Sequence, residues 1–236
     1  MAMSTFSGSG LIGTEASIPA ANFTDTATGT YTDGGVDYKY LTLTGTGTVT
    51  IDQAGFADVL VVAGGGYSYA TSGSTYRSAG GAGGVIYSAN KFLPIGTNSV
   101  VVGAGGASYS NGDDSVFIDL YAIGGAHGNS SNSYVSGFNG GSGSGASGSG
   151  VAVGLGINGQ GHDGGLVSSG ASAGGGAGGD GSGGTAGLGL LNSITGAGVT
   201  YATGGSATTA NTANSGNGGG GTAAGSSGVV IIRVVV

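Results

Sequence analysis

The sequence predicts a mostly β and irregular fold with no substantial α-helix, in which a small β-unit carries a glycine-rich sandwich. Three observations predict this fold. Of the 236 residues, 60 are glycine, whereas glycine makes up roughly 7% of average proteins. Between Gly64 and Gly228, no window of helix-forming residues is free of glycine, which disfavours a helix interior. Short apolar segments of β-like composition interrupt the glycine runs and supply the strands.

Three regions follow one another along the chain. Residues 1–36 are rich in Ser, Thr and Ala, and we expect them to form an N-terminal attachment arm. Residues 37–63 are expected to form the β-unit. Within it, residues 37–51 alternate apolar side chains with threonine, and a short apolar run over residues 57–66 is closed by glycines. Residues 64–228 are expected to form the glycine-rich sandwich.

The segment Val229–Val236 is apolar on both faces. Such a strand needs a partner and cover on both sides, so we expect it to pair near Val59–Ala63 and to close the β-unit. Further short strands are expected inside the glycine-rich region, at Gly84–Tyr87, Ser99–Ala104, Ser115–Ile123 and Val151–Leu155.

The glycine runs predict extended left-handed helices with three residues per turn. Such a helix has no internal hydrogen bonds, so neighbouring helices must pair its amides and carbonyls. Helices approach closely enough only where side chains are missing. In Gly174–Gly189, glycine recurs every third residue and predicts five successive turns with one bare edge, at positions 175, 178, 181, 184 and 187.

The stretch Asn98–Asp114 has the strand-then-glycine pattern of a dinucleotide-binding turn. That turn requires a helix directly after the glycines, because the helix N-terminus carries the phosphate. After Gly106 the sequence predicts instead a turn at Asn111 and Gly112, and then another strand. We therefore expect no nucleotide site.

Charge and composition exclude several classes of partner. The net charge is −7, and the basic residues do not cluster as a nucleic-acid or anionic-membrane surface requires. Without cysteine there is no disulfide or thiolate metal site, which fits a protein made in a reducing cytoplasm. The apolar C-terminal stretch is too short for membrane insertion. The basic residues are Lys39, Arg77, Lys91 and Arg233.

Catalysis, metals and cofactors are not expected. The aspartates lack the regular repeat of calcium-binding β-rolls, and His127 and His162 have no third ligand nearby in the sequence. Serine hydrolase motifs occur only as glycine-serine composition. One alternative stays open, because Asp119 and Asp163 could meet in space as paired carboxylates. The aspartates considered for calcium are Asp113, Asp114, Asp119, Asp163 and Asp180.

Loops that carry aromatic residues are the candidate receptor-binding sites, because rigid tyrosine rings give contact area at low entropic cost. They lie at residues 67–78, 127–140 and 190–203. Tyrosine and asparagine are also common in sugar-binding surfaces. The alternative is that these aromatics cap the glycine helices or pack between subunits. The candidate residues are Tyr67, Tyr69, Tyr76, Arg77, Tyr134, Phe138 and Tyr201.

Several motifs, taken in order, resemble the glycine-rich domains of tailed-phage tail-fibre and adhesin proteins. The resemblance covers about residues 40–236 and rests on TGTGTVTI, ADVLVVAGGG, GGAGGVIY, NSVVVGAGG, DSVFIDLYAIGG and GNGGGGTAAGSSGVVIIRVVV. It implies a polyglycine II sandwich in a virion protein, with recognition by variable loops between the glycine runs. This chain departs from the pattern in having fewer long glycine runs and more Ser and Thr.

The resulting expectation is a phage virion structural protein, a tail-fibre or tip adhesin without enzymatic activity. The N-terminal arm would contact other virion proteins, and the loops would contact a host glycan or outer-membrane protein. A homotrimer is expected, with Val229–Val236 gaining cover from partner subunits. Two alternatives stay open: a head decoration or capsid fibre protein, and an ice-binding protein that presents flat Thr and Ala faces.

Overall fold

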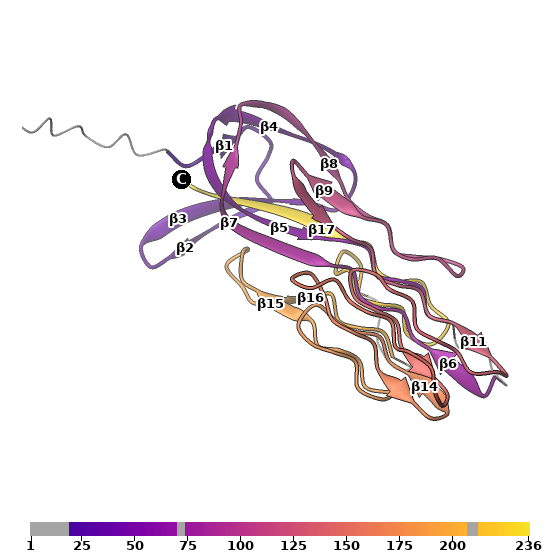
Figure 1. The fold of residues 1–236 in the computed structure, drawn as a ribbon. Coiled ribbons are helices and arrows are strands. Elements are labelled where there is room, and N and C mark those ends of the chain that lie inside the picture. Colours follow the sequence, from indigo (N-terminus) through magenta and orange to yellow (C-terminus); the bar gives the residue numbers. More distant parts are fainter. Residues whose placement is uncertain (1–18, 70–73, 207–211) are drawn as a thin grey trace, which may run out of the picture.

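The computed structural model describes residues 19–69, 74–206 and 212–236. In these residues the chain forms short strands and irregular extended segments, and no α-helix (Figure 1). The expected mostly β and irregular fold is therefore confirmed. After the glycines of residues 103–106 the chain reaches strand β9 (Ser115–Phe117) with no helix between them, as the sequence predicted for this segment.

Two five-stranded antiparallel sheets form the β-unit, which extends beyond the predicted residues 37–63 to strands between residues 22 and 122. The first has the order β1-β4-β8-β9-β10, with β1 at Asn22–Phe23, β4 at Gly47–Gln53, β8 at Gly96–Val101, β9 at Ser115–Phe117 and β10 at Leu120–Ala122. The second has the order β2-β3-β17-β5-β7, with β2 at Gly29–Asp33, β3 at Val36–Leu43, β17 at Val229–Val235, β5 at Gly55–Val62 and β7 at Val85–Leu93.

Strand β17 lies in the middle of the second sheet, which confirms the predicted closure. Val229 lies opposite Val62 of β5, and Val230 lies opposite Leu43 of β3. Both faces of β17 are covered by this chain itself, since Val230 and Ile231 are almost fully buried on opposite faces. Strand β17 therefore does not need cover from partner subunits and gives no support to the expected homotrimer. The homotrimer stays a prediction.

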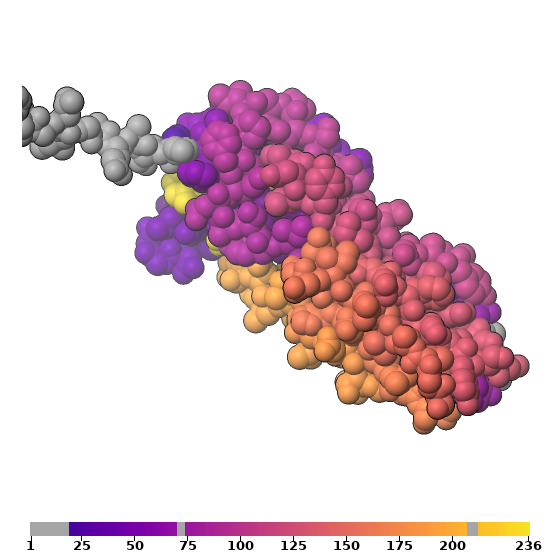
Figure 2. Space-filling view, viewed as in Figure 1, coloured from indigo at the N-terminus to yellow at the C-terminus, as the bar shows by residue number. Residues whose placement is uncertain are grey.

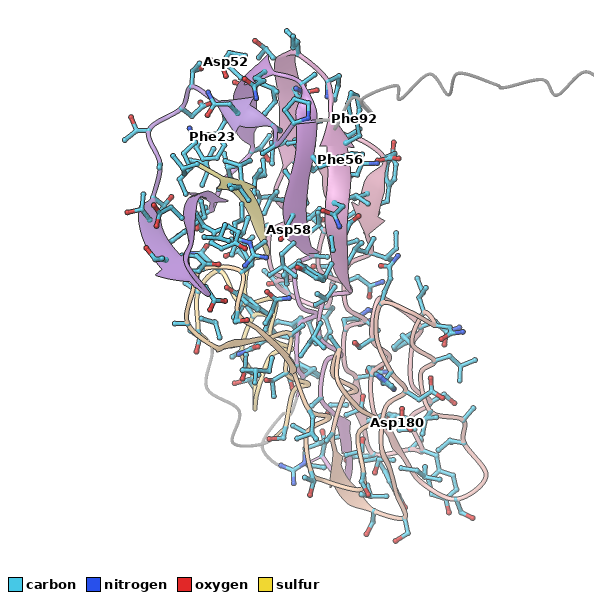
Figure 3. All side chains as sticks on the ribbon, turned by 90° about the vertical axis from the view of Figure 1, so that its left-hand side faces the viewer. Phe23, Asp52, Phe56, Asp58, Phe92 and Asp180 are labelled. Atoms are coloured by element: carbon cyan, nitrogen blue, oxygen red, sulfur yellow. The ribbon has the colours of Figure 1, made fainter. Side chains whose placement is uncertain are left out.

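Side chains fill the space between the two sheets. Alternate residues of β5 and β17 point into it and meet Phe23, Ile51 and Phe117 from the first sheet. Figure 3 labels Phe23 at the β-unit end of the molecule, together with Phe56 of β5 and Phe92 of the neighbouring strand β7. The opposite face of the second sheet packs on the glycine-rich part through a second apolar cluster that includes Leu60, Val62, Ile194, Tyr201 and Ile231.

Most of the predicted strands are present, although the only pairing predicted was that of the C-terminal strand with β5. Residues 37–51 and 57–66 contain β3, β4 and β5 as expected, and the next three predicted segments supply β7 to β10. The prediction of a strand at Val151–Leu155 is wrong. Gly154 donates to the Ser144 carbonyl, whereas the Ala152 carbonyl accepts from Gly137, so no ladder forms with a single neighbour.

The region expected to be an attachment arm divides at residue 19. Residues 1–18 lie outside the described residues. From Pro19 onward the chain belongs to the β-unit, since β1 pairs with β4 and β2 pairs with β3.

The glycine-rich part is a bundle of extended segments whose successive residues bond to different neighbours. The backbone N–H groups of Gly64, Gly65 and Gly66 donate to the carbonyls of Asp113, Ser226 and Gly81, which lie on three separate segments. Residues three apart return to the same neighbour. The N–H groups at positions 81 and 84 donate to the carbonyls of residues 126 and 123. This is the hydrogen bonding expected of three-residue-per-turn helices packed side by side.

Missing side chains make this packing possible. A Cβ atom added to Gly65 would lie 2.0 Å from the carbonyl oxygen of Asn217, a distance that no real contact allows. Where the interior does carry side chains, they are small, as in the fully buried Ala82, Ala126, Ser142 and Ser144.

Two details of the glycine-rich part differ from the prediction. The run 174–189 is not one helix of five turns, because paired hydrogen bonds between Ser182 and Thr185 close a turn within it. The predicted turn at Asn111 and Gly112 is also wrong. The chain instead reverses over residues 107–110, and Gly112 is extended and donates to the Gly125 carbonyl. In both places, hydrogen bonds between residues three apart close the turn.

The molecule is elongated, with the β-unit at one end and the glycine-rich bundle at the other (Figures 1 and 2). The two outer ends of the described chain lie at the β-unit, where the Pro19 carbonyl accepts from Phe56 and Val236 donates to the Asp37 carbonyl. Three short strands mark the remote end of the bundle: β6 (Tyr76–Ser78), β11 (Ser130–Ser131) and β14 (Gly170–Ser172). The remaining strands are β12 (Ala146–Ser147), β13 (Leu166–Val167), β15 (Leu190–Asn192) and β16 (Val199–Tyr201).

Candidate functional site

The remote end of the bundle is built on the three-stranded sheet β11-β6-β14. Its central strand carries Tyr76, which lies opposite Ser131 on one side and Gly170 on the other. The sequence places these three strands in three different loops, each between glycine runs. The fold therefore brings described parts of two of the predicted loops, 67–78 and 127–140, together at one end; residues 70–73 of the first loop lie outside the described residues.

Tyr76 and Tyr134 form the first aromatic contact of this end. Their ring centroids are 4.9 Å apart and the rings are nearly perpendicular, at 80°. Asn132 and Ser133 complete an open hollow of about 290 Å³ beside the two rings. Tyr134 is 53% exposed, so its ring is both held by contacts and accessible.

Tyr67 and Tyr69 form a second cluster, which Tyr109 completes. The rings of Tyr69 and Tyr109 are 4.3 Å apart, and Tyr67 lies within 6.4 Å of both. A side-chain hydrogen bond with Tyr69 raises the pKa of Tyr109 to about 12. Ser108 and Tyr109 have φ values of 49° and 68°, which are uncommon for residues with side chains.

Sequence reasoning missed Tyr109. It stands in the loop 107–110, between glycine runs, which is the same context that singled out the other aromatic loops.

Phe138 stacks on His127, with ring centroids 4.3 Å apart. The imidazole Nδ1 of His127 lies 2.7 Å from Oδ1 of Asn111, and burial lowers the pKa of His127. This residue therefore supports an aromatic side chain in one of the predicted loops. Among the residues that the structure describes, no group of three His, Asp or Glu side chains is placed to hold a metal ion.

Arg77 and Tyr201 do not join these clusters. Arg77 follows Tyr76 on β6, so the two side chains point to opposite faces of the strand. Its buried Nε has no hydrogen-bond partner within the described chain. Tyr201 is only 6% exposed and packs in the apolar cluster below the second sheet, where burial raises its pKa. Tyr201 is therefore a core residue, and its prediction as a receptor contact is corrected.

A second hollow, of about 390 Å³, lies where the bundle meets β15. His162 and Asp180 both line it and contact each other, with Nδ1 and Oδ1 3.2 Å apart, and Asp180 also accepts from the Asp163 N–H. Figure 3 shows Asp180 within the bundle, far from the labelled phenylalanines. The alternative of paired carboxylates loses support, because Asp119 is paired with Lys91 of β7, which lowers the pKa of Asp119.

Three of the four basic side chains are engaged in contacts within the chain. Lys91 and Arg233 are paired with Asp119 and Asp58, and Lys39 donates to the Phe23 carbonyl. The described residues include no helix that is long and apolar enough to cross a bilayer.

Comparison with known proteins agrees with this architecture. The fold and its hydrogen bonds define a class of all-β proteins whose packing depends on glycine. Residues 42–235, most of the chain, match the family described as the glycine-rich domain, and the chain belongs to this family. No curated protein matches the chain.

Proposed function

We propose that this chain is a phage virion structural protein, a tail-fibre or tip adhesin, that binds a receptor on the host surface without catalysis. The observation that carries the proposal is the separation of the two ends. The outer ends of the described chain meet at the β-unit, whereas two aromatic loops meet at the remote end of the bundle.

The scaffold under these loops is suited to recognition. Binding residues on loops work well when a rigid framework positions them. Here each loop leaves and rejoins segments whose amides are bonded to several neighbours. The proposed receptor-binding residues are those of the two clusters and the stacked pair: Tyr67, Tyr69, Tyr109, Tyr76, Tyr134 and Phe138.

Binding of the purified protein to host cells tests the proposal. We expect Tyr134→Ala and Tyr69→Ala each to weaken binding by about tenfold or more, as aromatic anchors do in interfaces. Tyr121→Ala is the matched control, because Tyr121 is 56% exposed but lies on β10 of the β-unit. Unaltered binding by both loop variants would remove these loops from the proposal.

Cross-linking from residues 1–35 in purified particles tests the position on the virion. A tail-fibre protein is expected as the cross-linked neighbour. Cross-links to the capsid lattice would replace the adhesin with a head decoration protein, and absence of the chain from particles would reject both. The size of the assembly in solution tests the homotrimer separately.

A further inference from the structure

We infer that the hollow formed by Tyr76, Asn132, Ser133 and Tyr134 is a binding site for one ring of a neutral saccharide. The inference rests on the proposed function, for which it names the class of receptor. It is argued from the shape of the hollow, its unused polar groups, its lack of charge and the way in which Tyr134 is held.

The shape fits a ring-shaped ligand with an apolar face. The two tyrosine rings stand at 80° to each other and form a corner. A sugar presents C–H groups on its face and hydroxyls around its rim. It can therefore lie on one tyrosine ring and touch the other with its edge. The volume of the hollow, about 290 Å³, is at the small end of the range for ligand sites. This size suits one sugar ring better than the surface of a protein.

The polar groups of the hollow are unused. Within the part of the chain that the structure describes, no hydrogen bond engages the side chains of the four lining residues; the backbone of Tyr76 pairs with Ser131 and Gly170, and the backbone N–H of Ser133 donates to the Ser131 hydroxyl. An amide and three hydroxyls are therefore free to donate to and accept from sugar hydroxyls. A few such groups around an apolar wall are what fixes the orientation of a small ligand.

The lining carries no charge. The nearest basic residue along β6, Arg77, points to the other face of its strand, and none of the four lining residues is acidic or basic. A carboxylated or phosphorylated sugar would therefore find no partner here, so the site favours a neutral one. A protein receptor is disfavoured as the occupant, since a stable interface needs roughly 800 Å² on each partner around an apolar core.

Bare backbone holds Tyr134 in place while leaving it exposed. A Cβ atom on Gly148 would lie 2.5 Å from Cγ of Tyr134, so the ring rests directly on this glycine. The φ of Gly148 is 132°, and its N–H donates to the Val167 carbonyl. Val135 and Ser147 exchange two backbone hydrogen bonds beside it. A ring fixed before binding loses little entropy when the ligand arrives.

The test uses the whole protein on an array of neutral and acidic oligosaccharides of hexoses and N-acetylhexosamines. We expect one class of neutral oligosaccharide to bind. Tyr134→Ala, Asn132→Ala and Gly148→Ala should weaken that binding by about tenfold. Tyr134→Phe keeps the ring but removes one of the three hydroxyls, so it should weaken binding less than Tyr134→Ala does, and Tyr121→Ala should bind as the unaltered chain does. Thermal unfolding of each variant separates lost binding from lost folding.

The outcomes separate this inference from the proposed function. Cell binding that depends on Tyr134 while no neutral oligosaccharide binds would overturn the saccharide site and leave a protein receptor for the adhesin. Binding of acidic oligosaccharides alone would also overturn it. Neutral oligosaccharide binding that is lost in Tyr134→Ala, without any binding to cells, would support the site and reject the adhesin.

Discussion

The β-unit and the glycine-rich bundle both bond their backbone polar groups and fill their interiors, but they do so in opposite ways. In the β-unit, backbone groups bond within two sheets, and large side chains such as Phe23, Ile51 and Phe117 fill the space between them. In the bundle, backbone groups bond in several directions at once, and the space between segments is closed by backbone itself.

The difference shows what each part requires from its sequence. The β-unit depends on which large residues are present, because interiors are close-packed and their volumes must match. The bundle depends on which side chains are missing, because a single methyl group separates hydrogen-bonded segments. The four predictions below test this contrast.

The largest effect is expected from removing a large side chain of the β-unit. Phe117→Ala deletes a fully buried ring and should lower the free energy of unfolding by about 3 to 5 kcal/mol, measured by urea unfolding. The matched control is Val101→Ala, since Val101 is 42% exposed and should lose less than about 1 kcal/mol. Equal losses would mean that the space between the sheets is not the core.

A smaller loss in the free energy of unfolding is expected from adding one methyl group to the bundle, where the β-unit loses stability when a side chain is removed. Gly65→Ala places a Cβ against the Asn217 carbonyl and should cost about 2 to 3 kcal/mol. Gly47→Ala, with nothing within 4 Å of its added Cβ, should change the free energy by less than about 1 kcal/mol. If the first variant were as stable as the second, backbone contact would not be what closes the bundle.

A gain is expected where the bundle buries a hydroxyl without a partner. Within the described residues, the fully buried Ser142 hydroxyl has no hydrogen bond, so Ser142→Ala should raise the free energy of unfolding by about 1 kcal/mol. Ser115 is equally buried, but its hydroxyl donates to the Val62 carbonyl and accepts from Gly103. Ser115→Ala should therefore destabilise, and thermal unfolding of the two variants should shift in opposite directions.

The smallest effect concerns the tyrosine cluster. In Tyr69→Phe, the pKa of Tyr109 should fall from about 12 toward its ordinary value of 10.0, because the hydrogen bond with Tyr69 is lost. A pH titration followed by the ultraviolet absorbance of the phenolate measures this pKa. A raised pKa means that this contact contributes stability below about pH 10, and that the contribution is lost as the pH rises through about 12. An unchanged titration would contradict the contact.

The strands of the β-unit were predictable from sequence because their apolar patterns are local. The alternation in residues 37–51 and the two-faced apolar strand at 229–236 carried enough information to predict the pairing of β17 with β5. For the bundle, the sequence predicted the type of helix but not where the segments turn. Glycine every third residue identified the helix type, but it did not reveal the turn that Ser182 and Thr185 close by exchanging hydrogen bonds, because glycine recurs on both sides of that turn.

The candidate site was predictable as a set of loops, but not as an arrangement. Aromatic loops between glycine runs identified Tyr76 and Tyr134, yet their contact depends on the bare backbone of Gly148. The same rule selected Tyr201, which lies in the core instead. An aromatic residue between glycines has the same local signature whether it faces solvent or the sheet, and only the tertiary fold distinguishes the two.

Strand β17 comes after every glycine segment in the chain, yet it occupies the centre of a sheet whose other strands all come before residue 94. The sheet is therefore unfinished until the whole glycine-rich part has been synthesised. Closing so long a loop delays folding, and the unfilled place between β3 and β5 exposes two strand edges to neighbouring chains in the meantime. Production of this protein is thus expected to be limited by how quickly the chain fills that gap.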